Sequence, residues 1–362
     1  MNYYVQEIAG NYLKNVMNEP QTMRVHPCFL HGIDREQFQA GFLALLRLIR
    51  SLYADIAKDP SGFGMLLKES FESDAKNTDY TNSNASFIRV PNLLLSFGAK
   101  GTLQPDKSLE LDGEKLLAAA KELKITSLPF LLIKLCEYGF RISGYAKTVK
   151  DGDRVHVSYP NNPYLVVALK AMADAQMLLN KGDLKKSKNY FYMLHSGLLE
   201  DEAVKAPKLT VESIYHSLDS KKREAAVALH EMVSKSSKPA IRMGGFMRND
   251  WSCVYTGIKN KKVIMSLQVC QDKLSAKLNL QHIGKYINKV MDYPEHIRET
   301  IRSSGWDCVH CREGCAGGFS FEMDSRTYNK CRCGAFLFAN ISNDEIPYCK
   351  ELLKQEIAYE NL

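Results

Sequence analysis

The sequence contains no apolar run long enough to cross a bilayer. Its longest apolar stretch, Phe42 to Leu46, gives way to Arg47 and Arg50, whereas a membrane-spanning helix needs about 20 apolar residues. The N-terminal residues also lack the basic segment and apolar core of a secretion signal. These absences predict a cytoplasmic protein with no membrane partner.

Familiar catalytic motifs are missing as well. The sequence has no phosphate-binding loop, no dinucleotide-binding glycine pattern and no Gly-x-Ser-x-Gly elbow. His26, Cys28 and His31 are spaced as H-x-C-x2-H, but no fourth metal ligand lies nearby in the sequence, so we interpret them as ordinary loop residues. We therefore expect a binding or regulatory protein. The alternative is an enzyme with an unfamiliar site in a cleft between the helical and sheet regions.

Disulfides are not expected either. Ten cysteines occur among 362 residues, five of them between Cys308 and Cys333, which fits reduced thiols plus one ligand cluster better than a disulfide framework. A hydrophobic content of 45% and a length sufficient for two or three domains indicate a globular chain. Four other cysteines lie in apolar settings and are predicted to be buried: Cys28, Cys136, Cys253 and Cys270.

The N-terminal half has the pattern of a helical region followed by a winged helix. Asp34 is a predicted N-cap, and apolar residues then recur at helical spacing up to Pro60. Residues 73–86 are polar and predict a linker loop. Between residues 113 and 160, two helices and a two-stranded hairpin follow one another, which is the element order of a winged helix.

The second of those helices has few side chains that could read DNA. It is almost entirely apolar, with Lys134 and Glu137 as its only charged residues, whereas a recognition helix presents polar side chains to base edges. Core packing or a protein contact is the favoured role. A DNA-binding transcriptional regulator that uses the hairpin lysines near residues 147–154 is the alternative.

Beyond Pro239 the apolar period changes from helical to alternating. Leu274, Ala276 and Leu278 alternate with polar residues, and two earlier segments show the same period, which predicts an antiparallel meander. The predicted fold class is therefore α+β, with a favoured domain boundary at the linker 234–239. We divide the chain into a helical region (1–86), a winged-helix-like unit (87–160), a second helical region (161–237), an antiparallel α+β domain (238–304) and a cysteine-rich, zinc-ribbon-like module with a C-terminal helix (305–362).

The cysteine-rich module carries the strongest chemical pattern. Its spacing is C-x2-C-x3-C, fifteen intervening residues, then C-x-C. Cys308 and Cys311 can form a tight knuckle, while Cys331 and Cys333, two apart in a predicted return strand, would point to one face. Four thiolates around one ion suit tetrahedral zinc, and a structural zinc can supply much of the folding energy of so small a module.

Other assignments of this cluster stay open. Cys315 or His310 could replace one of the four ligands. An iron–sulfur cluster, or unmetallated redox-active thiols, would also use these cysteines. The C-x-C pair departs from a standard zinc ribbon, which has C-x2-C in both knuckles. Cys349, on the predicted final helix, is not expected to be a ligand.

Positive charge is unevenly distributed. Residues 239–304 contain eleven Lys and Arg against five Asp and Glu, whereas residues 305–362 contain six against nine. A solvated sheet face would explain the excess, but it also permits an anionic or protein partner; nucleic acid is not favoured. The residues predicted to bind this partner are Lys261, Lys262, Lys273 and Lys277.

The same region resembles a known family. The stretch KPAIRMGGFMRNDWSCVYTGIKNKKVIMSLQV, the lysine-rich strand after it and YPEHIRETIRSSG are similar to the YdhG-like family of small α+β domains, over approximately residues 219–304. The features that carry the likeness are the entry strand from Lys238-Pro239 to Arg242, the lysine-rich hairpin and the helix start at Pro294-Glu295. The resemblance implies a twisted antiparallel sheet flanked by helices and no catalytic residues. The cysteine-rich module departs from it.

Overall fold

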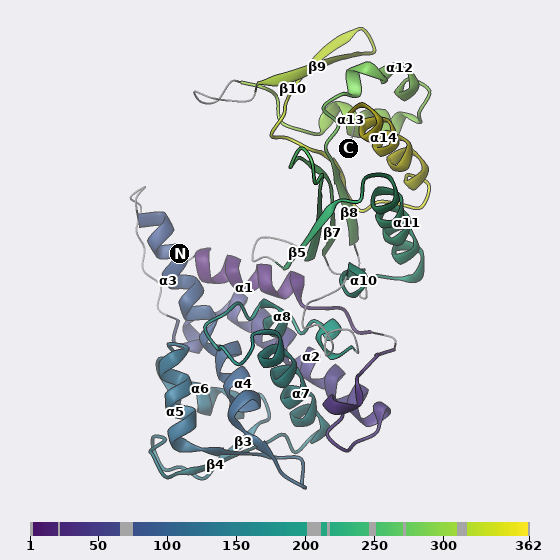
Figure 1. The fold of residues 1–362 in the computed structure, drawn as a ribbon. Coiled ribbons are helices and arrows are strands. Elements are labelled where there is room, and N and C mark those ends of the chain that lie inside the picture. Colours follow the sequence, from purple (N-terminus) through teal and green to yellow (C-terminus); the bar gives the residue numbers. More distant parts are fainter. Residues whose placement is uncertain are drawn as a thin grey trace. The chain divides into compact units, whose positions relative to one another are not determined.

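The computed structural model describes residues 3–20, 22–65, 75–200, 211–215, 218–245, 251–270, 273–309 and 317–360. The chain divides into two compact units, the first comprising Met1–Thr210 and Phe246–Asn249, the second Val211–Gly245 and Asp250–Leu362. Both combine helices with antiparallel strands, so the fold is α+β (Figure 1). No described helix is long and apolar enough to span a membrane.

The first unit is mainly helical and contains one four-stranded antiparallel sheet, with strand order β1-β2-β4-β3. Its described elements are α1 (Tyr3–Asn15), η1 (Pro27–Phe29), α2 (Arg35–Lys58), η2 (Ser61–Phe63), α3 (Ala75–Phe87), α4 (Arg89–Lys100), β1 (Thr102–Leu103), β2 (Leu109–Asp112), α5 (Gly113–Glu122), α6 (Leu128–Glu137), β3 (Arg141–Ser143), β4 (Arg154–Ser158), α7 (Tyr164–Leu179), α8 (Asn189–Tyr192) and η3 (Ser196–Leu199).

Helix α2 begins where the sequence predicts. The Asp34 carboxylate accepts the backbone N–H of Gln37 (2.8 Å), and the Gln37 side chain accepts the backbone N–H of Asp34 (3.3 Å), which is a capping box. The apolar stripe that follows is buried, and α2 packs against α7. A Cβ on Gly41 would stand 2.2 Å from the carbonyl oxygen of Tyr164, so the two helices approach so closely that only glycine fits.

Helix α3 covers residues 75–87, which include most of the segment 73–86 predicted as a loop. Its C-terminal residue, Phe87, is fully buried and stacks on Tyr12 of α1, with ring centroids 4.8 Å apart. Packing against another helix thus outweighs the weak helix propensity of a polar sequence.

The second unit is built on a five-stranded antiparallel sheet of order β11-β8-β7-β6-β5, with a separate two-stranded hairpin, β9–β10. Its described elements are α10 (Val211–Ile214), α11 (Ser220–Ser237), β5 (Ala240–Gly245), β6 (Trp251–Thr256), β7 (Val263–Cys270), β8 (Lys273–Leu278), η5 (Ile283–Lys285), α12 (Ile287–Val290), α13 (Glu295–Ser303), β9 (Gly318–Met323), β10 (Arg326–Cys331), β11 (Phe336–Phe338) and α14 (Ile346–Glu360).

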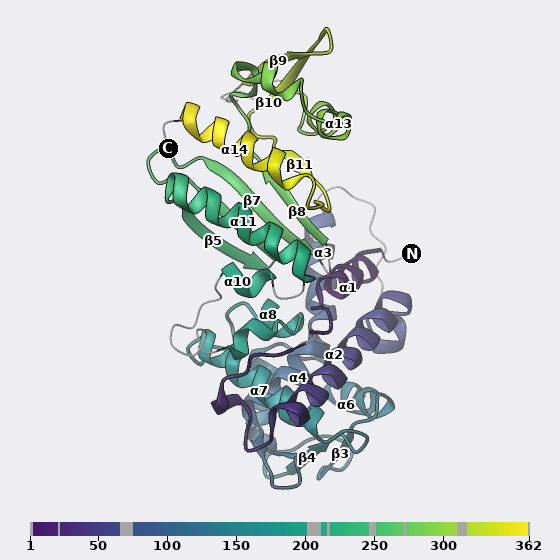
Figure 2. The same cartoon turned by 90° about the vertical axis from the view of Figure 1, so that its right-hand side faces the viewer.

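Helices α11 and α14 cover one face of the five-stranded sheet (Figure 2). The predicted alternation is confirmed, because Leu274, Ala276 and Leu278 are fully buried on that face. Tyr255 of β6 also points there, since its hydroxyl lies 2.9 Å from Nδ1 of His230 on α11. Residues 234–237, predicted as part of a linker, form the last turn of α11 instead.

Candidate functional site

The β9–β10 hairpin carries one of the predicted zinc ligands, Cys331, as the last residue of β10. Asp324 and Ser325 form its turn, and both have positive φ (50° and 59°), as in a type I′ turn, whose twist matches that of the flanking strands. The register places Gly318 directly opposite Cys331 at the open end of the hairpin.

A short segment before the hairpin pairs with β10. The N–H of Cys331 donates to the carbonyl of Trp306 (2.7 Å), and the N–H of Cys308 donates to the carbonyl of Asn329 (3.1 Å). Alternate residues of an antiparallel ladder share a face. Cys308 and Cys331 are therefore diagonal neighbours on one face of this arrangement.

Gly318 leaves the space that the Cys308 side chain occupies. A Cβ on Gly318 would stand 2.8 Å from Cβ of Cys308 and 3.0 Å from its Sγ, closer than such atoms pack. The Cys308 thiol thus lies over the glycine that pairs with Cys331. The structure brings these two predicted ligands together, although 23 positions separate them in the sequence.

Cys333 lies just beyond the strand. We predicted it within a return strand, but β10 ends at Cys331 and a turn follows, in which the N–H of Gly334 donates to the carbonyl of Cys331 (2.9 Å). The backbone N–H of Cys333 points at Sγ of Cys331, 3.4 Å away.

The remaining predicted ligands, Cys311 and the substitutes His310 and Cys315, lie outside the described residues. Within the described residues, no three histidine, cysteine or carboxylate side chains come close enough to hold a metal ion by themselves. The observed geometry is thus that of a neighbouring pair, Cys308 and Cys331, with Cys333 beside it.

Two of the four predicted partner-binding lysines share the sheet face that α11 and α14 leave uncovered. Lys273 and Lys277 alternate on β8 with the buried leucines, and Lys277 lies in a cross-strand row with Arg242 and Leu337. Lys261 and Lys262 lie in the turn between β6 and β7. The register places on this outward face the residues Ala240, Arg242, Ser252, Val254, Thr256, Ile264, Ser266, Gln268, Cys270, Lys273, Ser275, Lys277 and Leu337.

A groove between η5 and the β9–β10 hairpin was not predicted from the sequence. It has a volume of 690 Å³, and His282, Lys285, Ser320, Thr327 and Arg332 are among its lining residues. A Cβ on Gly284 would lie 2.8 Å from the carbonyl oxygen of Ser320, so η5 and the hairpin are in close contact at these two residues.

A buried carboxylate holds one wall of this groove. Glu356 of α14 is 2% exposed and accepts the backbone N–H of His282 (3.1 Å), its Nδ1 (3.0 Å) and the hydroxyl of Tyr286 (2.8 Å). Burial raises the pKa of Glu356, and the bonds from Tyr286 and His282 offset part of that rise. The 74 positions between His282 and Glu356 explain why no sequence pattern reveals the pair.

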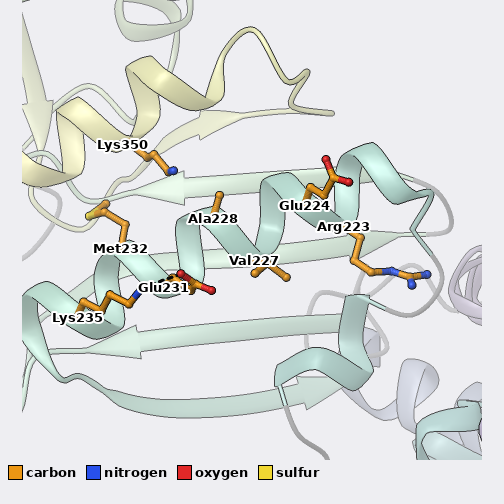
Figure 3. A pocket seen from close by; sticks show the side chains of 8 residues that line it. All are labelled: Arg223, Glu224, Val227, Ala228, Glu231, Met232, Lys235 and Lys350. Atoms are coloured by element: carbon orange, nitrogen blue, oxygen red, sulfur yellow. Dashed lines mark hydrogen bonds and ion pairs between the residues drawn. The ribbon is translucent and has the colours of Figure 1, made fainter.

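A second groove, of 510 Å³, runs along the exposed side of α11 (Figure 3). Lys235 and Glu231 are paired in it at 2.8 Å, and Lys350 of α14 points toward α11. Opposite charges and aliphatic side chains alternate along this groove, as on a solvated helix face. We assign it no ligand.

The predictions for the isolated cysteines are mixed. Cys253 is buried and Cys270 is half-buried, whereas Cys28 and Cys136 are exposed, so for these two the prediction is wrong. Cys28 is the middle residue of the 3-10 helix η1, and its Sγ is 2.9 Å from Nδ1 of His26. The predicted burial relied on apolar neighbours in the sequence, and these do not show whether a thiol faces the protein interior or the solvent. Cys349 is buried on α14, away from the thiol pair, as expected.

Comparison with family models, with curated proteins and with solved structures gives no match for this chain. The resemblance to the YdhG-like family remains a prediction from the sequence.

Proposed function

We propose that this chain is a binding protein whose second unit is stabilised by a structural zinc ion and binds an acidic protein through its outward sheet face. Cys308, Cys311, Cys331 and Cys333 are the proposed zinc ligands. The observation that carries the zinc proposal is the position of the Cys308 thiol over Gly318, beside Cys331. The outward face of the sheet supports the choice of partner.

Zinc suits this end of the hairpin for two reasons. Thiolates are its preferred structural ligands, and the backbone N–H of Cys333 lies 3.4 Å from Sγ of Cys331, so these two cysteines are close together. The hairpin is also small, with Phe321 and Met323 as its buried apolar residues among the described positions, so a metal would replace an apolar core that it lacks. Cys315 and His310 remain alternative fourth ligands.

The charge of the outward sheet face favours an acidic partner. Arg242 and Lys273 are exposed and Lys277 is half-buried, and none of the described outward positions is Asp or Glu. None is aromatic either, whereas surfaces that bind single-stranded nucleic acid stack bases on aromatic rings. Flat, small side chains rimmed by cations suit an acidic protein surface better.

The partner proposal is tested with poly-L-glutamate as the probe. We expect the zinc-loaded full chain to bind it at low salt, and Lys273→Glu with Lys277→Glu to weaken that binding about tenfold, since two charge contacts are reversed. Lys350→Glu with Lys354→Glu is the matched control, because α14 lies on the opposite face of the sheet. Equal losses in both double variants would show a mere net-charge effect and refute the proposed face. Tighter binding of a single-stranded oligonucleotide than of poly-L-glutamate would refute the proposed class of partner.

DNA binding by the first unit is the second candidate. Helices α5 and α6 precede the hairpin β3–β4, and the sheet order β2-β4-β3 supports a winged-helix-like interpretation. However, α6 exposes Phe130 (41%) and Ile133 (60%) where a DNA-reading helix needs polar groups. Duplex DNA binding that weakens steeply with salt, and that Lys147→Glu with Lys150→Glu abolishes, would favour this candidate.

A further inference from the structure

The groove between η5 and the hairpin has positively charged groups on both walls. Lys285 stands on one wall and Arg332 on the other, and neither has a carboxylate partner among the described residues. The Lys285 ammonium instead lies over the ring of Tyr359, 5.4 Å from its centroid. Cations held at a concave surface without a counter-charge attract an anionic ligand.

His282 lines the same groove and is held in a fixed orientation. Because a carboxylate only accepts hydrogen bonds, Nδ1 of His282 donates to Glu356. The ring also stacks on Tyr359, with centroids 6.3 Å apart. A buried carboxylate that orients a histidine is the arrangement by which proteins position an imidazole for a ligand.

Two hydroxyl side chains complete the lining. Ser320 and Thr327 lie on the hairpin wall; the Ser320 hydroxyl donates to the side-chain oxygen of Asn329 (2.6 Å). Glu322, exposed at the same wall, is directly opposite Thr327 in the ladder. Glu322 is the one carboxylate that lines the groove, against two cations and the oriented histidine. The volume of 690 Å³ is that of a site for a small organic molecule rather than for a lone ion.

We infer that this groove binds a small phosphate-bearing molecule, with Lys285, His282 and Arg332 around the phosphate. A guanidinium fork and an ammonium together offer more donors than a carboxylate ligand can accept, whereas the oxygens of a phosphate can satisfy them. Nε2 of His282, whose Nδ1–H is directed to Glu356, can accept a hydrogen bond from a P–OH group. The inference does not rest on the zinc or partner proposals, because His282 and Lys285 belong to neither site.

Calorimetric titration with inorganic phosphate and with pyrophosphate, each against acetate at equal ionic strength, tests the inference on the full chain. We expect saturable binding of both phosphates and none of acetate. Lys285→Gln and His282→Gln should each weaken phosphate affinity about tenfold, because each removes one charge-assisted contact. Lys289→Gln is the matched control, since Lys289 is exposed on α12 and does not line the groove.

Three results would each overturn the inference. They are unchanged phosphate affinity in both Lys285→Gln and His282→Gln, an equal loss of phosphate affinity in Lys289→Gln, and the absence of saturable phosphate binding. His282→Gln also alters a hydrogen-bond partner of Glu356, whereas Lys285→Gln leaves that network intact and decides the question alone. Arg332→Gln is read together with its zinc content, since Arg332 lies between two proposed zinc ligands.

Discussion

The hydroxyl of Tyr255 lies 2.9 Å from Nδ1 of His230 and 3.1 Å from the hydroxyl of Tyr215. Tyr255 is fully buried in β6, His230 belongs to α11, and Tyr215 follows α10. This polar cluster therefore fixes a helix and a strand to each other inside an otherwise apolar layer, where an unpaired polar group is costly.

Replacing Tyr255 by phenylalanine should destabilise the second unit. The change removes one hydroxyl and leaves the buried Tyr215 hydroxyl short of a partner, which costs about 1–3 kcal/mol. Chemical unfolding followed by circular dichroism measures the loss. Tyr328→Phe is the control, because its hydroxyl bonds to no described residue; an equal loss there would show that the cluster contributes nothing particular.

Adding one methyl group at Gly318 should disturb the hairpin and its thiols together. In Gly318→Ala the new Cβ would meet Cβ of Cys308 and the carbonyl oxygen of Lys330, each at 2.8 Å, so we expect a destabilisation of about 1–3 kcal/mol and weaker zinc binding. Gly10→Ala, where nothing lies within 4 Å of the new atom, should instead be neutral or stabilise helix α1 by about 0.5–1 kcal/mol. Unaltered zinc affinity in Gly318→Ala would contradict the proposed position of the metal.

Glu356 should make the stability of the second unit depend on pH. Burial raises its pKa above the ordinary value of 4.5, so between these two pKa values the folded state holds a proton that the unfolded state has released. The resulting stabilisation is present below pH 4.5 and is lost as the pH rises through the pKa of the folded state. Glu356→Gln, which is always neutral, should lose less stability between pH 4.5 and pH 7 than the wild type. Parallel pH profiles for the two proteins would rule this out.

Cys28 should react with disulfides faster than Cys136, although both thiols are exposed. The backbone N–H of Cys28 donates to Nδ1 of His26 (3.2 Å), so Nδ1 is the basic nitrogen and faces the thiol. A neighbouring base can accept the thiol proton as the sulfur attacks a disulfide, and we expect a rate difference of roughly three- to tenfold. Stopped-flow reaction with a chromogenic disulfide, with mass spectrometry to locate the adduct, measures it. His26→Asn should bring the rate of Cys28 down to that of Cys136.

The elements that sequence reasoning predicted well are those with strong local signals. Asp34 indicates the start of α2, and the alternation of apolar and polar residues indicates β8, because one face of the strand must be buried. In each case the residues that determine the structure are neighbours in the chain.

What the sequence could not provide depends on distant contacts. Helix α3 looked like a loop because its packing partner, Tyr12, is far away in the chain. The oriented His282 and the room that Gly318 leaves for Cys308 likewise arise from segments that meet only in the folded protein. The spacing of the cysteines predicted that Cys308 and Cys331 would meet, but not that β10 would end at Cys331.

Elemental analysis of the untagged protein tests the zinc proposal most directly. We expect about one zinc ion per chain. The double variant Cys331→Ser with Cys333→Ser should lose this ion. Cys349→Ser, whose thiol is buried on α14, should retain it. Iron with inorganic sulfide in place of zinc, or a chain that binds no metal even after refolding with excess zinc, would contradict the zinc proposal.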